Sequence, residues 1–276
     1  MSFRTFLGIL LLVSIPLSGQ SPVPDTLRKG SSVVKMAGDY VYETTVDSVL
    51  TIVINEILAR NSGFNYDQAG DDDDWFEIYN FGDDPVNLTQ LCFTDDLADP
   101  LKWSMDDAED IYLKPGEFYL LWADGEPGEG INHTNFKLSG DGESLSVFSK
   151  KGELIDQRTY PSQTVNISFG RYPDGATEWA YFDEPTPMEA NDSTPGSGVL
   201  PLPLTNLPGG IYNQPQSLHL YSVIPDADIR YTTDCSLPDI NSKKLSGLLA
   251  IDSTVIIRAR IMKEGHLDGP VLTLSF

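Results

Sequence analysis

LTIVINEIL, at residues 50–58, is a nearly continuous run of apolar and β-branched side chains. Such a run is typical of a strand that is buried on both faces or that crosses the core of a barrel or sandwich. WFEIYN follows at residues 75–80 and alternates, with Trp75, Glu77 and Tyr79 on one face of the expected strand. Together the two stretches predict a β-sheet whose central strand is buried.

Further short stretches with the character of strands follow at close spacing. Most of them are separated by polar or glycine-containing turns. They lie at residues 88–93, 118–123, 144–148, 154–160, 168–171 and 179–182, and in the C-terminal part at 216–221, 227–234, 254–261 and 269–276. This spacing is typical of antiparallel sandwiches or barrels, so we expect an all-β protein with two β-sandwich domains.

Turn-favouring residues divide the chain. PTP at residues 185–187 and NDSTPGSG at 191–198 favour a turn or an extended linker. We therefore expect an export signal at residues 1–20, an N-terminal linker with one possible edge strand at 21–48, a first domain at 49–191, a linker at 192–200 and a second domain at 201–276.

The N-terminus has the three parts of an export signal. Arg4 precedes an apolar run at residues 6–15, and PLSGQS follows at 16–21. The alternative is an uncleaved membrane anchor, but the run is shorter than the roughly 20 residues that cross a bilayer comfortably. The expectation is a secreted, periplasmic or cell-surface protein with no membrane span once the signal is removed.

Several blocks of the first domain resemble the bacterial lamin-tail domain. They are INEI at 54–57, DWFEIYN at 74–80, PVNL at 85–88, LKPGE at 113–117, NFKL at 135–138 and GRYPDG at 170–175. The resemblance covers about 140 residues, with the blocks in matching order and spacing. It implies an immunoglobulin-like β-sandwich that serves exported or surface proteins as an accessory module, often beside catalytic domains.

The second domain resembles the C-terminal domain of chitobiase and hexosaminidase-type enzymes. PGGIY at 208–212, IRYTTD at 229–234 and VIIRAR at 255–260 carry the resemblance. It implies a smaller immunoglobulin- or fibronectin-like sandwich. The chain departs from the pattern at Cys235, where the family has glycine, so either the turn differs or Cys235 takes a strained positive φ.

The net charge limits the kinds of molecule that the chain is expected to bind, and the cysteine content limits disulfide formation. The formal net charge is −23, from 41 acidic and 18 basic residues, which disfavours nucleic acid. Protein or carbohydrate at the cell surface is the expected partner, with the oligomeric state open. The only cysteines, Cys92 and Cys235, fall in different domains and are expected to be free, mostly buried thiols.

No set of residues in the sequence predicts catalysis. The three histidines lack metal-ligand spacing, and His133 is expected to have a structural role in a loop. Glu56 and Glu77, on neighbouring expected strands, are the best pair for glycosidase chemistry. Both belong to lamin-tail blocks, however, so the resemblance implies a structural role. We therefore predict no catalytic residues and no bound cofactor, apart from a possible Ca²⁺.

Two local features suggest binding. Asp71, Asp72, Asp73 and Asp74 form an acidic run that offers oxygen ligands for Ca²⁺, although adjacent side chains do not all converge on one ion and a solvated acidic loop is the alternative. Trp103 lies in a loop-like stretch and is the tryptophan whose core role is least certain, which makes it a candidate for carbohydrate contact.

The sequence therefore predicts a non-catalytic binding or structural module of an exported bacterial protein, with surface or glycan adhesion as its function. Two alternatives stay open. One is an accessory role in an extracellular enzyme system with a CotH kinase-like or nuclease partner, and the other is calcium-dependent adhesion.

Overall fold

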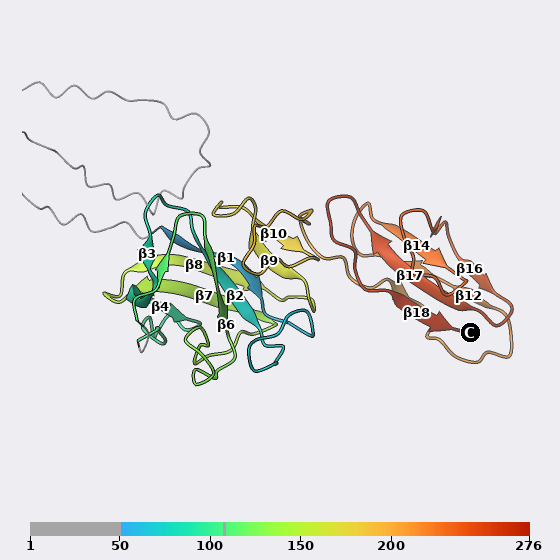
Figure 1. The fold of residues 1–276 in the computed structure, drawn as a ribbon. Helices are drawn as coiled ribbons and strands as arrows, with labels where there is room; N and C mark the ends of the chain where they lie inside the picture. Colours follow the sequence, from blue (N-terminus) through green and yellow to red (C-terminus); the bar gives the residue numbers. More distant parts are fainter. Residues whose placement is uncertain (1–50, 107–108) are drawn as a thin grey trace, which may run out of the picture.

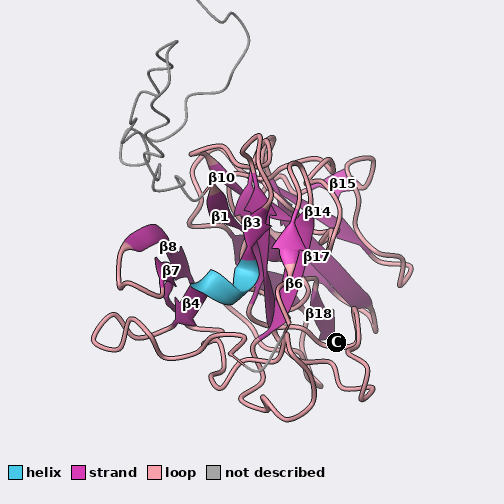
Figure 2. Ribbon diagram, turned by 60° about the vertical axis from the view of Figure 1, so that its left-hand side comes forward, coloured by secondary structure: helices cyan, strands magenta, loops and turns pink. Residues whose placement is uncertain are grey.

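Two β-sandwiches follow one another along the chain in the computed structural model, which describes residues 51–106 and 109–276 (Figure 1). Strands and loops make up these residues, together with one short 3₁₀ turn (Figure 2). Among them, no helix is long and apolar enough to cross a membrane. The expected export signal and the linker at 21–48 lie outside the described residues.

The first sandwich has a five-stranded antiparallel sheet facing a three-stranded one. The larger sheet has the order β10-β9-β1-β2-β6 and consists of β1 (Ile52–Leu58), β2 (Trp75–Asn80), β6 (Phe118–Trp122), β9 (Ser168–Arg171) and β10 (Trp179–Phe182). The smaller sheet has the order β4-β7-β8 and consists of β4 (Leu91–Thr94), β7 (Gly142–Ser149) and β8 (Leu154–Pro161). A short pair, β3 (Val86–Asn87) with β5 (Tyr112–Leu113), completes this domain.

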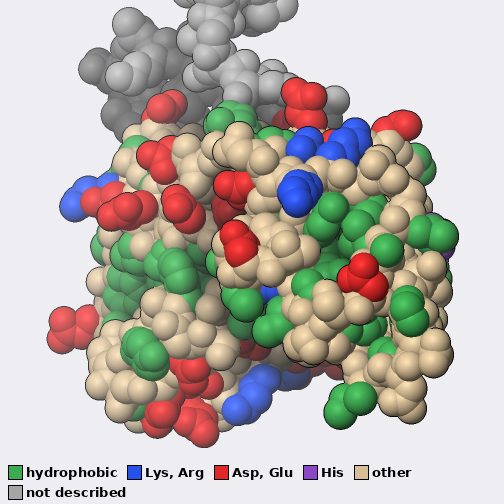
Figure 3. Space-filling model, turned by 90° about the vertical axis from the view of Figure 1, so that its right-hand side faces the viewer, with side chains coloured by type: hydrophobic (Ala, Val, Ile, Leu, Met, Phe, Trp, Pro, Cys, Tyr) green, Lys and Arg blue, Asp and Glu red, His purple; other side chains and the backbone are tan. Residues whose placement is uncertain are grey.

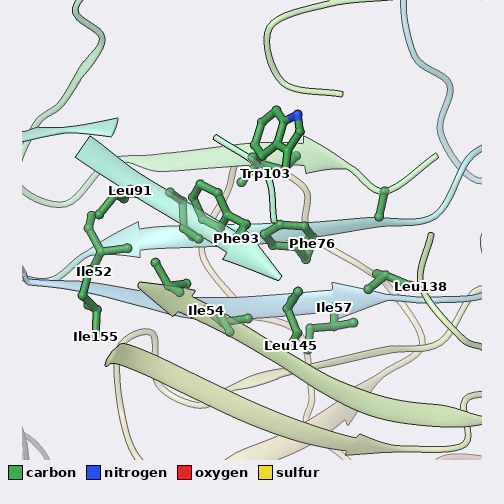
Figure 4. Close-up of a cluster of buried hydrophobic side chains, with 14 of the residues drawn as sticks. Ile52, Ile54, Ile57, Phe76, Leu91, Phe93, Trp103, Leu138, Leu145 and Ile155 are labelled. Carbon is green, nitrogen blue, oxygen red and sulfur yellow. The ribbon is translucent and has the colours of Figure 1, made fainter. Parts of the chain in front are cut away.

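The central position of β1 explains its apolar sequence. It pairs with β2 on one side and β9 on the other, and all seven of its residues are buried. The alternation predicted for β2 is confirmed, since Phe76 and Ile78 join the main core while Trp75 packs on the opposite face of the sheet. Figure 4 shows part of the main core, to which both sheets contribute.

One expected strand is wrong in its first half. Residues 88–93 are not continuous strand: Leu88–Gln90 forms the 3₁₀ turn, and β4 begins only at Leu91. The side chain of Asn87 accepts a hydrogen bond from the backbone N–H of Thr89 at 3.1 Å and so caps the turn. This local side-chain bond competes with the strand that the apolar pattern favours.

The second sandwich has a four-stranded sheet and two short strand pairs. The four-stranded sheet has the order β15-β14-β17-β18 and consists of β14 (Asp228–Thr232), β15 (Lys243–Lys244), β17 (Ile256–Met262) and β18 (Leu272–Ser275). The pairs are β11 (Leu204–Thr205) with β13 (Leu220–Tyr221), and β12 (Gln216–Leu218) with β16 (Leu249–Ile251). The expected strand at 216–221 is interrupted at His219, where the chain changes pairing partner.

The surface of the second sandwich differs in charge from the chain as a whole. Residues 201–276 hold seven acidic and six basic residues, so the acidic excess lies elsewhere in the chain. Figure 3 views the molecule from this side and shows apolar side chains scattered among polar ones.

The segment between the sandwiches bonds to both. Gly196 exchanges two backbone hydrogen bonds with Tyr181 of β10, at 2.8 and 2.9 Å. Leu200 then donates to the carbonyl of Leu267 at 3.1 Å and is buried in the second core. A Cβ on Gly196 would lie 2.5 Å from the Leu267 side chain, so the close approach requires glycine.

The two cysteines are free thiols in different surroundings. Cys92 is buried in β4, whereas Cys235 is exposed, so the expectation of mostly buried thiols is wrong for Cys235. Cys235 has a φ of 68°, and its carbonyl accepts a hydrogen bond from Arg258 at 2.8 Å. The turn thus keeps the conformation that glycine favours, and the cysteine takes the strain.

Candidate functional site

Two loops meet at one end of the first sandwich. The β1–β2 loop spans residues 59–74, and the β6–β7 loop spans 123–141. A backbone hydrogen bond joins them, since Ala123 N–H donates to the carbonyl of Asp74 at 2.8 Å. Within the β6–β7 loop, Trp122 N–H donates to the carbonyl of Asn132 at 2.9 Å, and the carbonyl of Trp122 accepts from Thr134 N–H at 2.8 Å. Side chains that are distant in sequence therefore occupy fixed positions here.

The loops bring together Asp67, Asp124, Glu129 and His133, which we call the His133 cluster. One ligand atom from each residue lies within 4.8 Å of the other three. Nδ1 of His133 hydrogen-bonds Oδ2 of Asp124, and it lies 4.0 Å from Oδ2 of Asp67 and 4.0 Å from Oε2 of Glu129. One imidazole nitrogen thus faces three carboxyl groups.

Hydrogen bonds position the other atoms of the cluster. Oδ1 of Asp67 accepts the backbone N–H groups of Gly70 and Asp71 at 2.7 and 2.9 Å. Oδ1 of Asp124 accepts from the backbone of Glu126 at 2.8 Å. Each aspartate therefore has one oxygen engaged in loop structure and directs its other oxygen toward His133.

The cluster is largely closed to solvent. The side chains of Asp67 and Asp124 are 0% exposed, His133 is 1% exposed and Glu129 is 33% exposed. Burial by itself raises the pKa of Asp67, but the backbone N–H groups of Asp71 and Gly70 outweigh it and hold that pKa below its usual range. Partial burial and the charges of Glu126 and Asp67 raise the pKa of Glu129.

The acidic run predicted from the sequence has mixed roles. Oδ2 of Asp72 accepts from the backbone N–H of Gly63, and Oδ1 of Asp74 accepts from that of Asn61, both at 2.8 Å. Asp71 and Asp73 instead approach Asp67, with one oxygen of each within 4.8 Å of the others. The four adjacent carboxylates do not converge on one point.

Burial affects the inner half of this run. It raises the pKa of Asp74 to about 6, and together with the nearby charge of Asp124 it raises the pKa of Asp73. These two side chains are therefore harder to ionise than ordinary surface aspartates.

Two family models match the chain. Residues 45–162 match Lamin Tail Domain, and residues 207–273 match Chitobiase/beta-hexosaminidase C-terminal domain. The first sandwich is therefore similar to the lamin tail domain, by which name we refer to it, and the second is similar to the chitobiase/β-hexosaminidase C-terminal domain. Both are immunoglobulin-like β-sandwich domains, which confirms the expected fold class. No curated protein and no solved structure matches the chain.

The two domains are accessory modules rather than catalytic domains, and they indicate a non-catalytic binding or structural module. The lamin tail domain contains the His133 cluster, in the β1–β2 and β6–β7 loops.

Trp103 packs into the core of the lamin tail domain. Its side chain is 8% exposed, and its ring centroid lies 5.8 Å from that of Phe93 (Figure 4). A backbone hydrogen bond from Phe93 to the carbonyl of Trp103, at 2.8 Å, fixes the segment. Most of the Trp103 ring is therefore buried in the core, but Trp103 also lines a groove beside the β6–β7 loop, so its contact with a sugar stays a prediction.

Glu56 and Glu77 of the lamin tail domain are both fully buried. Glu56 accepts hydrogen bonds from Ser168 and Thr186, and Glu77 accepts one from the backbone N–H of Met188. The two carboxyl groups thus attach the segment after β10 to the sheet, and neither is accessible to a sugar. This geometry matches the structural role that the family resemblance implies.

Sequence reasoning missed the His133 cluster as a unit. The sequence pattern indicates only a loop role for His133 and does not connect it with Asp67, which lies 66 positions earlier. The pairing of β2 with β6 brings them together, because it places the loop before β2 and the loop after β6 at the same end of the sheet, and no local sequence signal marks that pairing.

Proposed function

We propose that the chain is a carbohydrate-directed adhesion module of an exported bacterial protein. The observation that carries the proposal is a groove of about 430 Å³ in the lamin tail domain, lined by residues of the 103–106 segment and of the β6–β7 loop. Its lining combines the apolar side chains of Met105, Pro127 and Ile131 with the polar groups of Ser104, Asp106 and His133. Such a mixture suits a ligand that has both apolar and hydrogen-bonding faces.

Other features support this reading. The second domain is similar to a family named after two glycan-cleaving enzymes, chitobiase and β-hexosaminidase. The N-terminal sequence has the pattern of an export signal. The high negative charge disfavours nucleic acid as the ligand.

A glycan array probed with the full chain tests the proposal. Ile131 is 52% exposed in the groove, so Ile131→Glu places a charge where an apolar sugar face would lie. Leu237→Glu is the matched control, since Leu237 is 58% exposed in the second domain and outside the groove. We expect selective glycan binding that falls at least about tenfold with Ile131→Glu only. An array without bound glycans, or an equal loss in both variants, would refute the proposal.

A second candidate is an accessory role beside an extracellular enzyme. The match of residues 207–273 to a domain named from chitobiase and β-hexosaminidase favours it. The test is a kinetic one: the full chain is added to a purified exported enzyme encoded beside it, and the rate on an insoluble substrate is compared with the rate on a soluble one. A gain confined to the insoluble substrate supports this role, and no gain on either removes it.

A further inference from the structure

Oδ2 of Asp67 is a buried carboxylate oxygen that accepts no hydrogen bond from any described residue. The Asp67 side chain is 0% exposed, and this oxygen lies 4.0 Å from Nδ1 of His133, inside the His133 cluster. An unpartnered buried carboxylate oxygen is costly, because it has lost its water without gaining another donor. The position of Oδ2 therefore calls for a positively charged partner inside the cluster.

His133 directs Nδ1 to the same place. Its Nδ1 hydrogen-bonds Oδ2 of Asp124, and its Nε2 lies 3.3 Å from Oε1 of Gln68. Both of these oxygens only accept, so the hydrogen bond to Asp124 places a hydrogen on Nδ1. Nδ1 faces the oxygens of Asp67, Asp124 and Glu129, and a metal ion bound among them would replace the hydrogen on Nδ1, leaving the ring hydrogen on Nε2 with Gln68 as its acceptor. A hydrogen-bond acceptor at the far ring nitrogen is the usual support of a metal-binding histidine.

The ligand types distinguish between metals. Ca²⁺ and Mg²⁺ prefer oxygen ligands alone, whereas Zn²⁺ and related ions accept a mixture of imidazole and carboxylate. Ligand atoms around a tetrahedral Zn²⁺ lie about 3.4 Å apart, given metal–ligand distances of about 2.1 Å. The four atoms of the His133 cluster lie within 4.8 Å of one another, so small side-chain rotations suffice to bring them to one ion.

We propose that Asp67, Asp124, Glu129 and His133 bind one divalent transition-metal ion of the Zn²⁺ class. The ion replaces the hydrogen on Nδ1 of His133, which is released as a proton, and compensates the buried carboxylates. It also fixes the β1–β2 loop against the β6–β7 loop, since Asp67 lies on the first and the other three residues lie on the second. This proposal does not depend on glycan binding, because metal binding is measured in the absence of a glycan.

The neighbouring group of Asp67, Asp71 and Asp73 is the competing location for a cation. It consists of carboxylates alone and lacks an imidazole, so it matches Ca²⁺ better than Zn²⁺. Asp67 belongs to both groups, so a variant of Asp67 cannot distinguish the two sites. Variants of Glu129 and Asp71 can, because each of these residues belongs to one group alone.

Metal binding is tested on the full chain after treatment with EDTA and dialysis. ZnCl₂ is titrated by calorimetry and followed by thermal melting, CoCl₂ by its visible absorption, and CaCl₂ serves as the comparison. The ligand variants are Asp67→Asn and Glu129→Gln, which keep side-chain shape; Glu129 is partly exposed, so its variant is not expected to impair folding. Glu126→Gln is the matched control, and Asp71→Asn reports on the competing group.

We expect one Zn²⁺ to bind per chain and the melting temperature to be higher with Zn²⁺ than with Ca²⁺. The visible absorption of bound Co²⁺ should be that of an ion with a nitrogen ligand. Asp67→Asn and Glu129→Gln should weaken Zn²⁺ binding at least about tenfold, while Glu126→Gln and Asp71→Asn stay within about twofold of the unmodified chain. The proposal is overturned if the unmodified chain binds no Zn²⁺ or if Ca²⁺ raises the melting temperature as much as Zn²⁺ does. It is also overturned if Asp71→Asn weakens Zn²⁺ binding while Glu129→Gln does not.

Discussion

Glu56 of β1 lies directly opposite Glu77 of β2, and neither side chain has exposed surface. Burial raises the pKa of Glu56 to about 7. Burial and the neighbouring charge of Glu56 raise the pKa of Glu77 to about 9. Two adjacent buried carboxyl groups cannot both ionise without a large cost in free energy. The folded protein therefore favours a state in which at least one of the two is protonated.

This pair makes the stability of the first sandwich depend on pH. Because the folded pKa values lie above the ordinary value of 4.5, the stabilising contribution is fully present below about pH 4.5. It is lost as the pH rises through about 7 for Glu56 and about 9 for Glu77. The glutamine introduced by the variant Glu77→Gln cannot ionise. We therefore predict that the free energy of unfolding of this variant exceeds that of the unmodified chain by at least about 1 kcal/mol at pH 9 and by little at pH 5.

Urea unfolding at several pH values measures this difference. Glu153→Gln, an exposed change of the same kind, is the control and should leave the pH profile unaltered. Parallel profiles for Glu77→Gln and the unmodified chain would show that Glu77 does not titrate in this range.

Arg171 and Asp156 form the second prediction. Arg171 donates to both carboxylate oxygens of Asp156, at 3.0 and 2.9 Å, and to the carbonyl of Ile54 at 2.7 Å. The two side chains are 5% and 12% exposed. Arg171→Met should cost about 3–5 kcal/mol in unfolding free energy, because it leaves the Asp156 carboxylate buried without its partner.

The control for this change is Lys114→Met, which breaks an exposed pair with Glu117. It should cost less than about 1 kcal/mol. Denaturant unfolding compares the variants, and equal losses in both would contradict a special role for the buried pair.

Cys235 provides a prediction for the second sandwich. Its positive φ disfavours any residue with a Cβ, so Cys235→Gly should raise stability by about 0.5–1 kcal/mol, the strain relieved minus the extra backbone entropy of glycine. Thermal melting of the full chain measures the gain. Cys235→Ala, which keeps the Cβ, should show none; a gain with alanine would attribute the effect to the thiol instead.

Thiol labelling tests the different surroundings of the two cysteines. Cys235 is exposed and should react with iodoacetamide in the native protein, whereas Cys92 is buried and should react only after unfolding. Burial also raises the pKa of the Cys92 thiol, which lowers its thiolate fraction further. Mass spectrometry of the labelled peptides gives the order, and prompt native labelling of Cys92 would contradict it.

Substitution of Trp103 distinguishes a role in core packing from a role in ligand binding. Since its ring packs against Phe93, Trp103→Ala should cost about 3–5 kcal/mol in stability. Leu101→Ala, at a side chain that is 49% exposed, should cost little. Loss of glycan binding at unchanged stability would instead mean that Trp103 contacts the ligand.

Local sequence pattern predicted much of the fold. Residue alternation places Trp75 and Phe76 on opposite faces of β2, and the structure has them there because successive side chains in a strand point to opposite sides. At Cys235 the family resemblance left two alternatives, a different turn or a strained positive φ, and the structure has the second. The 3₁₀ turn at Leu88–Gln90 was missed because a single capping bond from Asn87 decided it.

The sequence by itself determined where most strands lie and the direction of most strand side chains, since both depend on neighbours along the chain. Only the tertiary structure decided that Trp103 is buried, that Cys235 is exposed, and that Asp67 meets Asp124 and His133. The last contact depends on the pairing of β2 with β6, which brings two loops to the same end of the sheet. No local pattern encodes such a meeting, because it arises from hydrogen bonds between strands far apart in the chain.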